Sequence, residues 1–131
     1  MLKVGDFEVG SIVLCEMIRP ELFNKLILLG VFPADICVPV FPFSIQVTPY
    51  IELHPTKRGL SRIEYRFINS SDLAAGIQIE VNVEETGRVT AIPLPPFLVS
   101  VQEPGDIHLE MKSGNSDWVR ILSRQVSLGQ F

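Results

Sequence analysis

The chain has 131 residues, of which 47% are hydrophobic and 20% are charged, and its formal net charge is −4. This length suits one packed domain that needs neither metal ions nor disulfides, and we expect residues 1–131 to form a single domain. The eleven Lys and Arg are scattered along the chain, which argues against nucleic acid as a partner.

No apolar stretch reaches the roughly 18 to 20 residues that are needed to cross a bilayer. The most apolar window, residues 26–43, is interrupted by Gly30, Asp35 and three prolines. Residues 1–10 carry Asp6 and Glu8 and lack the basic start and apolar stretch of a secretory signal. We therefore expect a cytoplasmic protein without a membrane span.

The first third of the chain contains two apolar stretches, residues 10–17 and 25–32, each of which is expected to form a strand. Residues 20–26 between them are the one segment with the character of a helical turn, and they are too short to change the fold class. Three prolines then follow in residues 33–42. Because proline has no N–H to donate to a ladder, this segment is expected to run along a sheet edge or between sheets.

The middle of the chain alternates apolar and polar residues. Residues 61–68 and 77–83 each place apolar side chains at every second position, and a hairpin at residues 55–59 is expected to join residues 45–53 to the first of them. A period of two puts one face of a strand in the core and the other in water. This pattern is typical of half-buried antiparallel strands.

The last third continues in the same way. Further strands are expected at residues 89–92, 97–102, 107–112 and 118–122. Gly87 and Gly114 fall where hairpin turns need a positive φ, prolines fill residues 93–96, and residues 129–131 are expected to be a loose end. The sequence predicts an all-β antiparallel β-sandwich of eight or nine strands, immunoglobulin-like or C2-like, with little or no helix.

The most distinctive motif is Cys15-Glu16-Met17-Ile18-Arg19, followed by Asn24-Lys25 and then Gly30-Val31-Phe32. It resembles an uncharacterised family of small bacterial all-β proteins, a domain of unknown function, that opens with Cys-Glu-Asp-(Ile/Val)-Arg, Gly-Lys and Gly-Val-(Tyr/Phe). Met17 departs from the usual acid and Asn24 from the usual Gly. Since Asn also tolerates a left-handed turn, a tight hairpin is still expected. The resemblance covers about a fifth of the chain and implies no activity or catalytic residue.

Three residues are candidates for binding. Glu16 and Arg19 lie close to the connection between the first two strands, where we expect them to form a charge-assisted pair that holds its shape; a partner-binding role is the alternative. Trp118, the only tryptophan, is expected to anchor the core, with an interface role as the alternative.

No catalytic or metal centre is expected, and no cofactor. The only histidines are His54, beside a strand end, and His108, on the polar face of an alternating strand; both are expected to be ordinary surface residues rather than catalytic bases. Cys15 and Cys37 lie in apolar surroundings and are expected to be buried free thiols. These four residues show no paired zinc-ligand spacing.

The sequence thus predicts a non-catalytic protein-interaction or assembly module of a bacterial system that works through a presented surface, with self-association as a homodimer or larger species. The alternative is a calcium- or lipid-dependent membrane-surface module of the C2 type. That alternative requires Asp72, Asp106 and Asp117, which fall singly in predicted turns, to converge at one end of the fold. A third possibility is an enzyme with His54 or His108 beside a carboxylate in a deep pocket.

Overall fold

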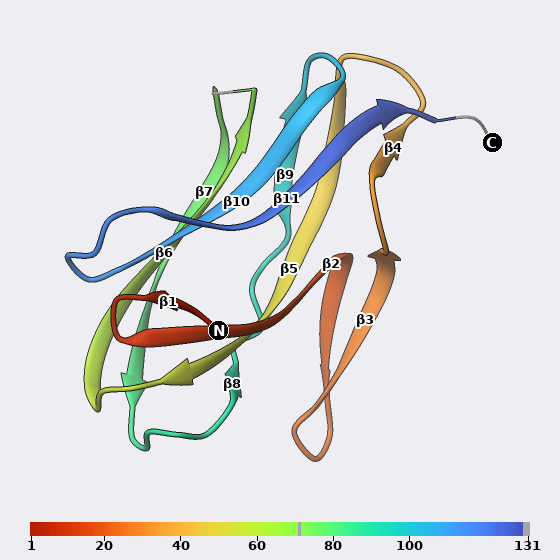
Figure 1. Ribbon diagram of the computed structural model, residues 1–131. Coiled ribbons are helices and arrows are strands. Elements are labelled where there is room, and N and C mark those ends of the chain that lie inside the picture. Colours follow the sequence, from red (N-terminus) through yellow and green to blue (C-terminus); the bar gives the residue numbers. More distant parts are fainter. Residues whose placement is uncertain (71, 130–131) are drawn as a thin grey trace.

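The computed structural model describes residues 1–70 and 72–129. These residues form eleven strands and no helix, arranged in two strongly curled sheets (Figure 1). The described ranges accordingly contain no long apolar helix that would span a membrane. The all-β prediction is confirmed at this level.

The first sheet has six strands. Its main order is β1 (Leu2–Val4), β2 (Phe7–Glu21), β5 (Phe43–Pro55) and β8 (Thr90–Ala91). In addition, β3 (Lys25–Phe32) pairs with the C-terminal half of β2, and β9 (Phe97–Val101) pairs with the N-terminal half of β5. The two long strands β2 and β5 therefore each change neighbours along their length.

The second sheet has five strands in the order β4 (Ile36–Val38), β11 (Val119–Leu128), β10 (Gly105–Ser113), β6 (Gly59–Asn69) and β7 (Asp72–Val83). All neighbours are antiparallel except β4 and β11, which run parallel. The chain crosses from the first sheet to the second through residues 33–35, and β4, within the proline-containing residues 33–42, lies at the edge of the second sheet, as expected for that segment.

The core lies between the sheets and follows the alternation of the sequence. Tyr65 and Phe67 on β6 are buried, as are Leu109 and Met111 on the neighbouring β10. Phe67 meets Phe97 of the opposite sheet edge to face, with ring centres 5.2 Å apart. Period-two patterning thus identified the inward face of these strands correctly.

Several local expectations are corrected. The helical turn predicted at residues 20–26 is wrong, because β2 continues to Glu21 and a hairpin turn follows; the left-handed conformation expected at Asn24 is confirmed, with φ at 57°. Strands β1 and β4 were not predicted, since three residues are too few to show a period. Cys37 is exposed rather than buried, because it points away from the core between two inward residues of β4. Gly129 of the expected loose end donates to Val38 O at 2.9 Å, and residues 130–131 lie outside the described ranges.

Candidate functional site

The N-terminal hairpin leaves the body of the first sheet as a two-stranded arm. Pairing between β2 and β5 ends at Cys15 and Thr48, whereas pairing between β2 and β3 continues to Glu21 and Lys25. From Glu16 onward, β3 is therefore the only ladder neighbour of β2 within the described residues. Residues 16–32, called the arm below, extend away from β5 as a ribbon (Figure 1).

Side chains of β5 hold the root of the arm where the ladder stops. The carbonyl oxygen of Glu16 accepts hydrogen bonds from Thr48 Oγ1 and Gln46 Nε2, both at 3.0 Å. The thiol of Cys15 donates to the Thr48 carbonyl at 3.3 Å. Thr48 is fully buried, and its hydroxyl takes the place of the backbone donor that the Glu16 carbonyl no longer has where the ladder ends. Burial raises the pKa of the Cys15 thiol, which makes it a structural group rather than a reactive one.

The motif residues Glu16 and Gly30 meet on the arm. Gly30 has a φ of +65°, and a Cβ placed there would lie 2.5 Å from Oε1 of Glu16 and 2.7 Å from its Cγ and Cδ. The side chain of Glu16 therefore lies across the glycine. This packing favours a structural role for Glu16.

The expected ion pair between Glu16 and Arg19 does not form. Residues three apart on a strand point to opposite faces, so the two side chains diverge. Arg19 instead contacts Glu21, two positions on and on the same face, at 3.3 Å. Both side chains are well exposed, and such a pair contributes little stability.

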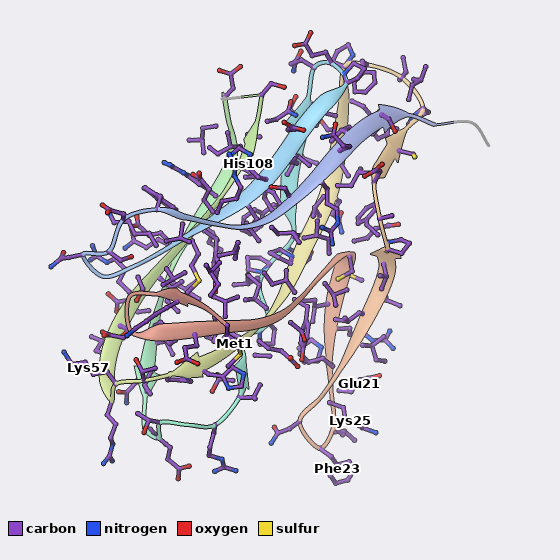
Figure 2. All side chains as sticks on the ribbon, in the orientation of Figure 1. Met1, Glu21, Phe23, Lys25, Lys57 and His108 are labelled. Atoms are coloured by element: carbon purple, nitrogen blue, oxygen red, sulfur yellow. The ribbon has the colours of Figure 1, made fainter. Side chains whose placement is uncertain are left out.

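The arm carries apolar side chains on both faces. Residues 26–32 of β3 are an uninterrupted apolar run apart from Gly30. Val31 is 48% exposed, and Leu29 and its cross-strand neighbour Met17 are each 38% exposed. At the tip, Leu22 and Phe23 are 79% and 90% exposed. Figure 2 shows Phe23 at the far end of the hairpin, pointing away from the rest of the molecule.

The outer edge of β3 is open to the addition of another strand. In the part of the chain that the structure describes, β3 pairs with β2 alone, so its second edge presents free backbone groups. The other long edge strand, β7, exposes Gln78, Glu80 and Asn82 at alternate positions, and such polar side chains discourage strand addition. On β3 the only charged residue is Lys25, at its start.

A second cluster lies on the outer face of the five-stranded sheet. The Arg66 guanidinium stacks 3.9 Å from the ring centre of Trp118, and Arg66 Nε donates to Glu110 Oε1 at 2.6 Å. The expectation that Trp118 anchors the core is wrong, because it precedes β11 on this outer face and is only half-buried. The arginine neutralises Glu110 and supports the indole ring, so the cluster ties β6, β10 and the turn before β11 together.

His108 belongs to the same face, with Nε2 3.7 Å from Glu110 Oε2. Its pKa is lowered, first by burial and then by Arg120, while Glu110 and Asp106 oppose the shift. The imidazole is thus beside a carboxylate, but on the outer face of a sheet. His54 lies on β5 opposite Glu8 of β2, far along the chain from this cluster.

The three turn aspartates do not converge. Asp72, at the start of β7, and Asp106, at the start of β10, lie at the same end of the sheet on either side of Asn69, whereas Asp117 follows the turn beyond the other end of β10. Across residues 1–70 and 72–129, no three His, Cys, Asp or Glu side chains come together in a way that would hold a metal ion. The geometry required by the calcium-dependent alternative is absent from these residues.

Of the three candidate binding residues, Glu16 and Arg19 lie on the arm and Trp118 lies on the outer face of the other sheet, so the structure does not unite them. Sequence reasoning missed the buried Thr48 at the root of the arm and the free edge of β3. The one related signal is that residues 26–29 do not alternate, which indicates apolar side chains on both faces but does not report the unpaired edge. Comparisons with protein-family models, curated proteins and solved structures find no match, so the resemblance of the Cys-Glu motif stays an expectation.

Proposed function

We propose that the protein is a non-catalytic assembly module, in a bacterial system as the motif implies, that binds another protein by adding an extended strand to the free edge of β3. The observation that carries this proposal is the contrast between the two long edges. The edge of β7 is lined by exposed polar side chains, whereas β3 offers apolar side chains on both faces and backbone groups without partners.

Strand addition uses both features of this edge. Backbone hydrogen bonds to the added strand supply affinity, and the alternating side chains supply specificity. Full burial of one large aliphatic side chain contributes about 1.5–3 kcal/mol. Leu29 and Val31 are close to half exposed, so covering them contributes roughly half of that each.

A photoreactive amino acid at position 29 tests the proposal in cells. Illumination is expected to give a discrete protein adduct. The same amino acid at Leu60, an exposed leucine on β6 that already pairs with β7, is the matched control and is expected to give none. Equal adducts at the two positions, or none at position 29, would contradict the proposal.

We also propose, for the fold itself, that the two curled sheets form a β-sandwich of the immunoglobulin-like or C2-like kind. The contact of Phe67 with Phe97 across the sheets supports a shared apolar layer. An experimental structure in which the sheets close into one continuous barrel ladder would contradict this subtype.

A further inference from the structure

We propose that the strand added to β3 is the β3 of a second copy of this chain, paired antiparallel about a two-fold axis that passes beside Leu29. This inference rests on the proposed function and names its partner. Three features support it: the alternation of side chains along β3, the positions of the charges at its two ends, and the position of the exposed arm tip.

Symmetry restricts the register. A two-fold axis perpendicular to the sheet places the same face of both β3 strands on the same side. Directly opposite residues of antiparallel strands also point to one side. Opposed positions must therefore both be odd or both be even, and one residue must face its own copy.

The composition of β3 identifies that residue. Leu29 is the middle of the apolar run at residues 26–32, so centring the pairing there places every apolar residue of one copy opposite an apolar residue or Gly30 of the other. Met17 lies beside Leu29 across the arm. The sheet then carries a continuous row in the order Met17, Leu29, Leu29 of the second copy, Met17 of the second copy.

The charges at the two ends of β3 fit the same register. Lys25 falls opposite Pro33 of the second copy, just beyond the apolar run and two positions from that copy's Asp35. Within the residues that the structure describes, neither Lys25 nor Asp35 has an ion-pair partner. The antiparallel arrangement brings this unpaired cation and this unpaired anion together twice, once at each end.

The exposed tip of the arm is also covered in this arrangement. In this register Phe23 lies alongside residues 33–35 of the second copy, where Pro33 and Ala34 are exposed. The most exposed aromatic ring of the described chain thus faces another exposed apolar segment. One symmetry operation therefore covers the tip, the edge and the connection after β3.

Light scattering and directed disulfides test the inference. At tens of micromolar the full chain is expected to be a dimer, with twice its mass of 14.6 kDa. In a Cys37→Ser background, Leu29→Cys is expected to form an interchain disulfide on mild oxidation, since directly opposed residues lie within disulfide reach. Ile27→Cys and Leu60→Cys are expected not to, because Ile27 is offset from its own copy by four positions along the strand. Unchanged thermal midpoints show that each variant is folded.

The outcomes separate this inference from the proposed function. A monomer at these concentrations overturns the second copy as partner, and a photoadduct from position 29 with a different protein then leaves strand addition standing. A dimer that is linked through Ile27 and not Leu29 overturns the register. A dimer linked through Leu60 and giving no adduct at position 29 overturns both proposals.

Discussion

Replacement of Gly30 by alanine tests whether the packing of Glu16 requires glycine at position 30. At a φ of +65° an L-residue pays a steric penalty on the order of 1–2 kcal/mol. The new Cβ would also lie 2.5 Å from Oε1 of Glu16, so that side chain must move away. Gly30→Ala is therefore expected to lower the free energy of unfolding by about 2 kcal/mol, or roughly 5–8 °C in Tm for a chain of this size.

Gly87 provides the matched control. Its φ is +77°, and nothing lies within 4 Å of a Cβ built there, so Gly87→Ala reports the backbone penalty without the contact. We expect Gly30→Ala to be the more destabilising of the two in urea denaturation. In a Glu16→Ala background the two costs are expected to become equal, which gives a coupling energy of about 0.5–1 kcal/mol between Glu16 and Gly30. Equal costs in the wild-type background, or a coupling of zero, would refute the packing of Glu16 over Gly30.

Four further predictions concern the arm root, the two thiols, the pH dependence and metal binding. Thr48→Val removes one of the two donors to the Glu16 carbonyl and is expected to cost about 0.5–1.5 kcal/mol in urea denaturation, since Gln46 still donates to that oxygen; a variant as stable as wild type would contradict the role of this bond. Ellman's reagent is expected to label Cys37 in the native protein and Cys15 only after unfolding, because one thiol is exposed and the other is buried with a raised pKa. The folded-state pKa of His108 lies below its ordinary value of 6.5, so the unfolded chain binds more protons just below pH 6.5 and stability falls as the pH drops through that value. His108→Gln is expected to lose less stability between pH 7 and pH 5, and a parallel loss would count against the shift. Millimolar calcium or a chelator is expected to leave Tm unchanged, since the three turn carboxylates do not converge within the described residues; a rise with calcium would contradict that geometry.

Local pattern was enough to predict most strands and their inward faces. The bounds of β3 and the left-handed Asn24 were both predicted, because an apolar run and a turn residue are local properties. The sequence did not predict that β2 changes its neighbour at Glu16, since this change depends on Thr48, which lies 32 positions away in the chain. The apolar and polar pattern along β2 carries no information about a hydrogen bond to a side chain so distant in the sequence.

The candidate site was predicted in part. Glu16 was singled out from the sequence, but the structure places it against Gly30 rather than Arg19, because three steps along a strand reverse the side-chain direction. Trp118 was assigned to the core on its apolar surface alone, whereas the stacked Arg66 keeps it on an outer face. That stacking depends on the register of β6 against β10, which the sequence of either strand alone does not specify.

The polar border of β7 sets an upper limit on any assembly built through β3. An isologous contact consumes the same edge on both copies and leaves no identical edge for a third. The remaining borders are strands of five residues or fewer, the Glu16–Glu21 part of β2, which carries Pro20 and three charged residues, and the long β7 with its exposed Gln78, Glu80 and Asn82. Growth is therefore expected to close at two chains, and fibre formation by sheet extension would require the acidic and amide side chains of β7 to be replaced first.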